Sequence, residues 1–361
     1  MTEKRTILVT AVSGYWGSRV AGRLGALEDC HVIGIDVQAP LEESANVDFI
    51  QADIRNPLIG ELLRAEAVDT VCHLAFVDRV GLSETAFDVN LMGTMKLCGA
   101  CAEVGIRKIV LKSSTAVYGA RPTNPAFLSE QHALRGSRRY GYTRDMVEIE
   151  AFCSGFRRQV PDLMLTILRF PSIVGPAADT PMTRFLRQRY SPTLMGFDPM
   201  MQVIHEEDVV AALVHAVAHD APGVFNVAAL DPLPLSRVRG LAGKPLLPVF
   251  HPFVYAAVGL LGRARLEPSR CAPMDPDYLR YTWVADLSKM QQELGFEPAH
   301  TAPETLREFG ERERGGGGPP DALNSDYGEE HLRAVMEERS QIHDEQQINE
   351  PTVVAEGEEH D

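Results

Sequence analysis

Short apolar segments alternate with amphipathic segments along the first half of this sequence, and this order constrains the fold more than any other feature. Apolar strands separated by amphipathic helices build a parallel sheet that helices cover on both faces. We therefore predict an α/β fold with a doubly wound parallel sheet. The expected strands are 6–10, 31–35, 68–74, 108–112 and 163–170, and the expected helices are 20–27, 58–65, 91–104 and 145–156.

A turn rich in small residues follows the first expected strand and leads into the first helix. It reads Thr10-Ala-Val-Ser-Gly14-Tyr-Trp-Gly17. Small residues let the backbone approach a pyrophosphate, and the start of the helix supplies free N–H donors and a partial positive charge. Ala11 stands where the first glycine of such turns is usual. Its methyl group is a modest obstacle at negative φ and a serious one at positive φ. By itself, the pattern also fits a tight turn without a ligand.

The second expected strand ends in Asp36, 19 residues after Gly17. A carboxylate at this place accepts hydrogen bonds from the ribose diol of an adenosine, and it repels a 2′-phosphate. No arginine follows directly, since Val37 and Gln38 come next. The spacing therefore favours NAD over NADP as the cofactor, although a solvent-facing aspartate at a strand end is the plain structural alternative.

Several further motifs occur in a characteristic order. They are Ala52-Asp53-Ile-Arg, His73-Leu-Ala-Phe76, Asn90-x-x-Gly-Thr94, Ser113-Ser-Thr-Ala-Val-Tyr-Gly119, Tyr140-x-x-x-Arg144, Leu168-Arg-Phe-Pro-Ser-Ile-Val-Gly-Pro176, His205-Glu-Glu-Asp208, Gly223-x-Phe-Asn226 and Asp286-x-Ser-Lys. Together with the turn and Asp36 they resemble the extended short-chain dehydrogenase/reductases, and more narrowly the NAD-dependent epimerase/dehydratase family in its UDP-glucose 4-epimerase-like branch. The resemblance covers about residues 6–310 and implies a Rossmann fold.

The resemblance also implies a set of cofactor contacts along the chain. Tyr15 and Trp16 complete the turn beside the diphosphate, and Asn90 braces the helix next to the site. The remaining contacts are Asp53 and Ile54 at the adenine, Leu74, Ala75 and Phe76 along the pyrophosphate and the nicotinamide ribose, and Phe170 and Pro171 near the nicotinamide ring.

Hydride exchange at a carbinol carbon needs a base that takes the alcohol proton and ionises near neutral pH. The ordinary pKa of tyrosine is about 10, so a nearby cation must stabilise the phenolate. Tyr140 and Arg144 are one helical turn apart and can face the cofactor together. The resemblance assigns Tyr140 as the base, and Ser114 as the group that polarises the substrate oxygen. Arg144 replaces the family's lysine, and a polar helix start without catalytic function is the alternative interpretation.

The substrate side departs from the family in two further places. Ser172 stands where the family has asparagine, and Met201 where an arginine commonly holds the diphosphate of a sugar nucleotide. We expect an NAD-dependent epimerase or oxidoreductase that acts on a small molecule resembling a sugar nucleotide. Two rivals stay open, a dehydrogenase or reductase for an apolar alcohol and a non-catalytic NAD-binding regulator or scaffold.

The second half of the sequence predicts the domain organisation. We expect an NAD-binding domain in 1–175, joined by 202–229, and a small substrate lobe in 176–201 and 230–314. A glycine- and proline-rich linker and a disordered acidic tail are expected in 315–361, which has 13 acidic and two basic residues. Asp208 is expected to cap a helix over 209–218.

Partners and location are constrained by composition. Most of the net charge of −15 lies in the tail, and nucleic acid is disfavoured because phosphate binding needs a basic face. The longest apolar stretch, 245–261, is interrupted by His251 and Pro252, and the N-terminus has no apolar leader, so we expect a cytoplasmic protein without a membrane contact. We expect no metal site. We also expect a homodimer through the helices after Asn90 and Tyr140.

Overall fold

A computed structural model describes residues 4–315 except 42–43, 79–80, 189–191, 246 and 264–274. The predicted linker and acidic tail lie outside the described residues, apart from Gly315. Among the residues described, no helix is both long and apolar enough to cross a lipid bilayer.

A seven-stranded parallel sheet forms the centre of the molecule, which confirms the predicted fold class. Its strand order is β11-β6-β5-β4-β1-β2-β3. The order reverses direction at β1, and in such sheets ligands bind at the carboxyl ends of the strands near this reversal. The strands are β1 (Arg5–Thr10), β2 (Cys30–Asp36), β3 (Asp48–Gln51), β4 (Thr70–His73), β5 (Lys108–Ser114), β6 (Met164–Phe170) and β11 (Gly223–Asn226).

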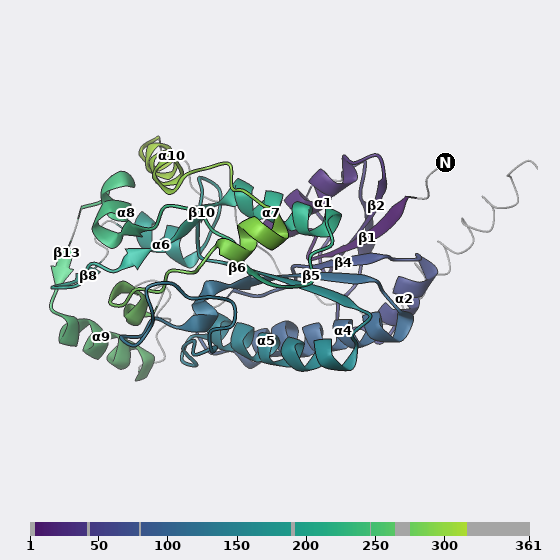
Figure 1. Cartoon of the computed structure of the whole chain (residues 1–361), viewed down its shortest axis with the longest axis horizontal. Helices are drawn as coiled ribbons and strands as arrows, with labels where there is room; N and C mark the ends of the chain where they lie inside the picture. The colour runs from purple at the N-terminus through teal and green to yellow at the C-terminus, as the bar shows by residue number, and fades with distance from the viewer. Residues whose placement is uncertain are drawn as a thin grey trace, which may run out of the picture.

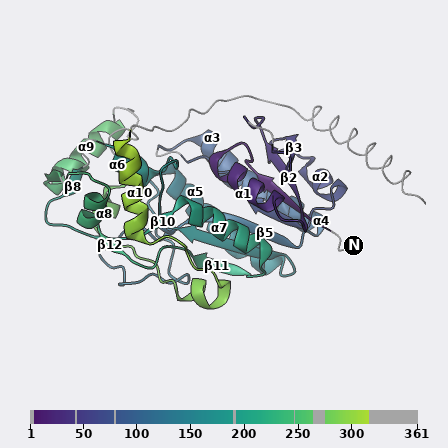
Figure 2. The same ribbon diagram turned by 90° about the horizontal axis from the view of Figure 1, so that it is seen from above.

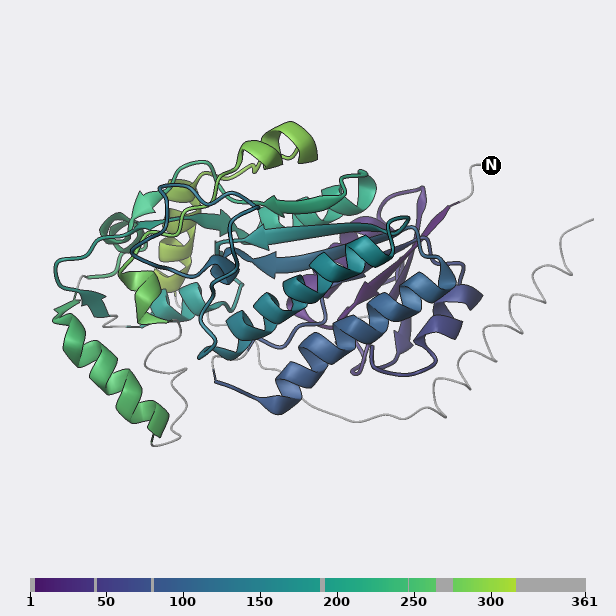
Figure 3. The same ribbon diagram turned by 60° about the horizontal axis from the view of Figure 1, so that its bottom comes forward.

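Helices cover both faces of this sheet (Figure 1). On one face α1 (Tyr15–Gly25) and α7 (Glu206–Ala218) lie side by side, as Figure 2 shows. On the other face α4 (Gly93–Val104) packs beside α5 (Gly141–Gln159), with α2 (Ile59–Ala65) at the end of α4 (Figure 3). Each face buries its own apolar core.

The sequence periodicity places the start of the first helix too late. Helix α1 begins at Tyr15, directly after the turn, and not at residue 20 as predicted. The reason is that the first turn of α1 carries Trp16, which packs only partly against the core, and polar Ser18 and Arg19, so the apolar stripe becomes visible only from Val20.

The elements outside the central sheet enclose a third apolar core. Phe185, Val238 and Phe309 are buried at its centre. The strands pair as β7 (Ser172–Val174) with β10 (Val203–His205), β8 (Pro192–Leu194) with β13 (Leu247–Val249), and β9 (Met200–Met201) with β12 (Leu233–Pro234). The helices are α6 (Pro181–Arg187), α8 (Leu235–Leu241), α9 (His251–Arg263) and α10 (Ala302–Arg314).

Candidate active site

The turn between β1 and α1 presents an open helix N-terminus. Gly14 is the N-cap residue, no side chain caps the helix, and its first turn contains no acidic residue. A Cβ on Gly17 would lie 1.9 Å from the carbonyl oxygen of Ala11, so only glycine allows the helix to start this close to the strand. Free N–H groups in a positive end field bind anions, so this donor set fits the diphosphate of a dinucleotide.

Ala11 has a φ of +56°, in the left-handed region. The structure therefore has the unfavourable one of the two conformations that the sequence left open. A non-glycine residue in this region costs about 1–2 kcal/mol. The turn nevertheless keeps its tight form, because the amide of Gly14 donates to the Ala11 carbonyl at 3.0 Å.

Asp36 lies at the end of β2 next to this turn. One carboxylate oxygen accepts from the Ser13 amide at 3.0 Å, and the other from the Gln38 amide at 3.3 Å. Burial raises the pKa of Asp36, while these amide contacts lower it, and the net direction is upward. A carboxylate has about four acceptor sites, so two backbone bonds leave capacity for a ribose diol.

A buried hydrogen-bond relay fixes the ends of β1 and β4 relative to each other. The Thr10 hydroxyl accepts from the amides of Leu74 and Ala75 at 2.9 and 3.0 Å, so its proton points to Nδ1 of His73, 3.0 Å away. Nε2 of His73 then donates to Thr94 at 2.9 Å. Burial lowers the pKa of His73 to about 3. The imidazole therefore stays neutral and holds the loop after β4 in place.

The relay continues to the start of α5. Asn90 accepts from the Val77 amide at 2.7 Å and donates to the carboxylate of buried Asp145 at 2.9 Å. Asp145 in turn accepts from Nε and Nη2 of Arg144 at 2.8 and 2.7 Å, and the guanidinium lies 4.6 Å from the ring centroid of Phe87. The guanidinium of Arg144 is thus held by Asp145 and Phe87.

A cavity of about 190 Å³ opens at the carboxyl ends of β4, β5 and β6. Ser114 and Tyr140 line it together. The Tyr140 hydroxyl is buried and has no hydrogen-bond partner among the described residues. Burial, followed by the charges of Asp275 and Asp277, raises the pKa of Tyr140. A buried hydroxyl without a partner is costly, and a bound substrate oxygen would satisfy it.

Comparisons with known proteins agree with this geometry. A model of the NAD dependent epimerase/dehydratase family matches residues 7–228. The chain belongs to the NAD dependent epimerase/dehydratase family. This membership confirms the predicted family, and with it NAD as the cofactor that the family is described to depend on.

Two relatives by sequence and one solved structure are similar to this chain. "Uncharacterized protein Rv0501" of Mycobacterium tuberculosis is 34% identical over 318 residues, which cover 84% of this chain and 83% of the relative. UDP-glucose 4-epimerase of Mycolicibacterium smegmatis is 28% identical over 292 residues, which cover 73% and 90%. The structure is similar, with a TM-score of 0.66 and 21% identity, to a mutant UDP-glucuronic acid 4-epimerase from Bacillus cereus in complex with UDP-4-deoxy-4-fluoro-glucuronic acid and NAD; the match covers 86% of this chain and 99% of that one.

The structure divides the predicted site residues into those that line the cavity and those that do not. The cavity is lined by Trp16, Leu74, Phe76, Ser114, Tyr140, Phe170 and Pro171. The predicted residues that do not line it are Ala11, Gly14, Tyr15, Gly17, Asp36, Asp53, Ile54, Ala75, Asn90 and Arg144.

The two residues that the resemblance places at the adenine, Asp53 and Ile54, are held by local contacts. The carboxylate of Asp53 accepts from Nε of Arg55 at 3.0 and 3.1 Å. Burial raises the pKa of Asp53, but the Arg55 contacts outweigh it and leave the pKa below its ordinary value. Ile54 is buried. Its side chain packs against Gly93, the residue that follows the π-helical turn η1 (Asp88–Met92), and a Cβ on Gly93 would lie 2.6 Å from it.

Charged residues that sequence reasoning did not single out also line the cavity. They are Asp78, Lys112, Asp179 and Asp275. Tyr142 lines it as well; the sequence offers it as a second phenol, but the residue one helical turn later is Met146 and not a cation. The one sequence feature that could have indicated these charged residues is Lys112, a charged residue at the end of the expected apolar strand 108–112, two positions before Ser114. The aspartates lie in irregular segments, where no periodicity indicates the direction of a side chain.

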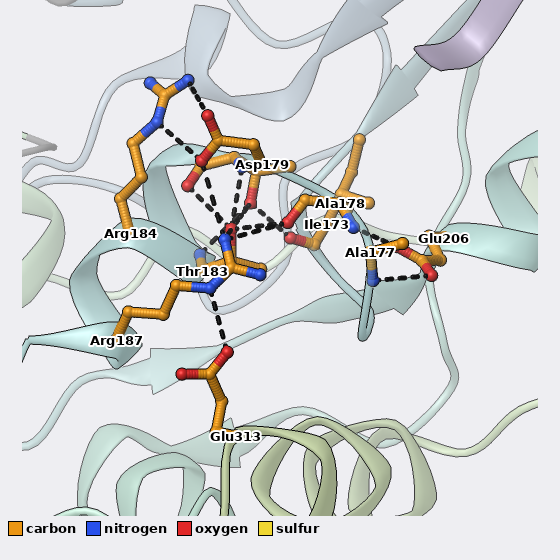
Figure 4. A network of polar contacts seen from close by, with 10 residues as sticks. Ile173, Ala177, Ala178, Asp179, Thr183, Arg184, Arg187, Glu206 and Glu313 are labelled. Carbon is orange, nitrogen blue, oxygen red and sulfur yellow. Dashed lines mark hydrogen bonds and ion pairs between the residues drawn. The ribbon is translucent and has the colours of Figure 1, made fainter. Parts of the chain in front are cut away.

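A network after β7 holds the segment that brings Asp179 to the cavity. Figure 4 shows Glu206 beside Ala177 and Ala178, where its carboxylate accepts from the amides of both residues. Arg184 binds Asp179 through two bonds of 2.9 Å. A Cβ on Gly175 would lie 2.2 Å from the Glu206 carboxyl group, so glycine is required where the loop crosses it.

One expectation near α7 differs from the structure. Asp208 does not cap this helix, because α7 starts at Glu206 with His205 as N-cap residue. Asp208 instead accepts from the amides of Ala299 and His300, at 2.9 and 3.0 Å, and so binds the segment before α10. Met201, which stands where the family commonly has an arginine, is buried in the third core.

Proposed function

We propose that this protein is an NAD-dependent epimerase or closely related oxidoreductase that transfers hydride at a carbinol carbon of a sugar-nucleotide-like substrate. The observation that carries the proposal is the Tyr140 hydroxyl, buried without a described partner in a cavity that Ser114 also lines. Support for the substrate class comes from similar proteins that are UDP-glucose 4-epimerases.

The chain's own groups account for the proton transfers of such a reaction. Bound NAD would accept the hydride from the substrate carbon and later return it to the other face. Tyr140 takes the proton of the substrate hydroxyl as the carbonyl forms, and it returns the proton when the alcohol is restored. The Ser114 hydroxyl accepts from the Ala116 amide at 3.2 Å, which leaves its proton free to donate to the substrate oxygen.

The raised pKa of Tyr140 bears on the direction of these transfers. Burial and the nearby aspartates keep the phenol protonated at neutral pH in the structure without ligand. A protonated phenol is ready to donate to a carbonyl oxygen. In the oxidation half, the phenolate needs a neighbouring positive charge, which the nicotinamide of oxidised NAD supplies.

The test is an assay of the NAD-loaded protein with UDP-, GDP- and dTDP-sugars, read by ¹H NMR of the sugar products. We expect one epimeric product without net formation of NADH. Tyr140→Phe should lose about 100-fold or more of kcat. Tyr281→Phe removes a phenol outside the cavity and should leave kcat unchanged. Full activity of Tyr140→Phe would contradict the proposal.

A dehydrogenase or reductase for an apolar alcohol is the second candidate. The observation that favours it is the aromatic part of the cavity lining, formed by Phe76, Phe170 and Trp283. Three aspartates and one lysine also line the cavity, and this excess of negative charge disfavours an anionic diphosphate, as does the buried methionine at position 201 in place of an arginine. Net formation of NADH from a simple alcohol, with no effect of sugar nucleotides, would select this candidate.

A non-catalytic NAD-binding regulator or scaffold is the third. The observation that favours it is Arg144, which Asp145 and Phe87 engage and which does not line the cavity. Tight NAD binding without turnover of any substrate, and a biological output that survives Tyr140→Phe, would select it.

We also propose a homodimer and a cytoplasmic location. The five described cysteines are free thiols, which supports a reducing compartment.

A further inference from the structure

Lys112 occupies a central place at the carboxyl ends of the strands. In β5 it lies between Leu111, which is level with His73 of β4, and Ser114, which is level with Phe170 of β6. Alternate residues of a strand face the same side, so Lys112 and Ser114 share a face. Both line the cavity. In the sheet, β5 lies between β1 and β6, so Lys112 lies between the turn after β1 and the end of β6.

Lys112 lies close to the turn between β1 and α1, which we assign to the diphosphate. Its Nζ lies 5.4 Å from the ring centroid of Trp16, in the first turn of α1. Among the described residues that line the cavity, it is the only cationic side chain. No carbonyl or carboxylate of the described residues accepts a hydrogen bond from it, while the arginine at position 144 is bound by Asp145.

We propose that Lys112 is a cofactor-binding residue whose ammonium group pairs with the diphosphate of the bound dinucleotide. The assignment rests on the proposed function only in taking NAD as the cofactor. An ammonium group is a compact point charge that suits phosphate oxygens, and it adds a full charge to the N–H groups of α1. Burial lowers the pKa of Lys112 to about 8, although the charge of Asp78 raises it. A bound anion would relieve this cost of burial.

The test is calorimetric titration of the full-length protein and its variants with NAD, ADP-ribose and adenosine. We expect Lys112→Met to weaken the binding of NAD and of ADP-ribose by about tenfold or more, equally for both, and to leave adenosine unchanged. The affinity of Lys112→Met for NAD should also depend less on salt concentration. Lys112→Arg keeps the charge and should retain most of the affinity. Lys4→Met removes an exposed lysine and should change nothing.

The outcomes separate this assignment from the proposed function. Unchanged NAD affinity in a folded Lys112→Met protein would overturn the role of Lys112 and leave the proposed function intact. Weakened binding of UDP to the NAD-loaded protein, with unchanged NAD affinity, would assign Lys112 to a substrate phosphate and also overturn it. If Lys112→Met does not fold, equal salt dependence of NAD and adenosine binding in the wild type would overturn it. No binding of NAD by the wild type would contradict the proposed function itself.

Discussion

Ala11 is the residue where the backbone conformation and the amino acid disagree. Its φ of +56° suits glycine, and the left-handed region costs alanine about 1–2 kcal/mol. Glycine loses about 0.5–1 kcal/mol more backbone entropy on folding. We therefore expect Ala11→Gly to raise the free energy of unfolding by up to about 1 kcal/mol, measured by urea denaturation. Ala11→Val, which adds a β-branch, should lower it. A clear loss of stability in Ala11→Gly would show that the turn does not hold this conformation.

The pKa of Lys112 predicts a pH dependence of cofactor binding. Burial lowers this pKa to about 8, while Asp78, the charged group that faces it from the loop after β4, raises it. The ammonium is charged below the pKa and neutral above it, and phosphate binding favours the charged form. NAD affinity should therefore fall as the pH rises from 7 to 9. Calorimetry at three pH values checks this, and Lys112→Met should remove the dependence. An identical decline in that variant would assign it to another group.

Helix α1 offers a matched pair of glycines. A Cβ on Gly17 would lie 1.9 Å from the Ala11 carbonyl oxygen, and backbone must shift to admit it. Gly22 in the same helix has no atom within 4 Å of such a Cβ. We expect Gly17→Ala to lower the free energy of unfolding by about 2 kcal/mol or more and to abolish NAD binding. Gly22→Ala should raise stability by about 0.5–1 kcal/mol, because alanine is the better helix former. Thermal unfolding and calorimetry of both variants test this, and equal effects would contradict it.

The elements of the central sheet were the part of the structure that the sequence predicted best. Strands buried on both faces are apolar throughout, and this signal is local, so all five expected strands are present. Two strands of the sheet, β3 and β11, were not among the expected strands. In β3, Asp48 and Gln51 interrupt the apolar character, and β11 is only four residues long. The predicted start of α1 and the predicted cap of α7 were wrong for a related reason. Helix ends depend on backbone turns and side-chain contacts, and the periodicity of apolar residues does not report these.

Within the candidate site, the sequence predicted only the residues that belong to recognisable motifs. Ser114 and Tyr140 meet in one cavity, and the cofactor turn has an open helix end. The engagement of Arg144 by Asp145 was not predictable, because it depends on the relay from Asn90 across to α5. Lys112 became apparent only when the register of β5 placed it beside Ser114.

At the scale of the whole molecule, the structure bears on the dimer that we expect through the helices after Asn90 and Tyr140. Of the apolar residues on these helices, Leu97, Met146, Val147, Ile149 and Cys153 are buried in the core of the chain itself. Met92 and Met95 are exposed by 39% and 37% on the face that carries α4 and α5. This favours a dimer through these two methionines over one through the full set.

The dimer is testable through charge. We expect the double variant Met92→Lys, Met95→Lys to be a monomer and the wild type a dimer, because paired lysines cannot be buried at a contact without partners. Size-exclusion chromatography with light scattering measures the mass. Leu41→Lys changes a leucine that is 95% exposed elsewhere and should remain dimeric. A monomeric wild type would contradict the proposed dimer.

The central claim is that a dinucleotide lies across the strand ends, with its adenosine ribose at Asp36 and its nicotinamide at the cavity of Tyr140. The most direct test is calorimetric titration of the purified protein, freed of bound nucleotide, with NAD and with NADP. The account predicts one NAD site per chain and at least about tenfold weaker binding of NADP, a difference that Asp36→Asn should reduce. Equal affinities for the two dinucleotides, or no binding of either at millimolar concentration, would contradict it.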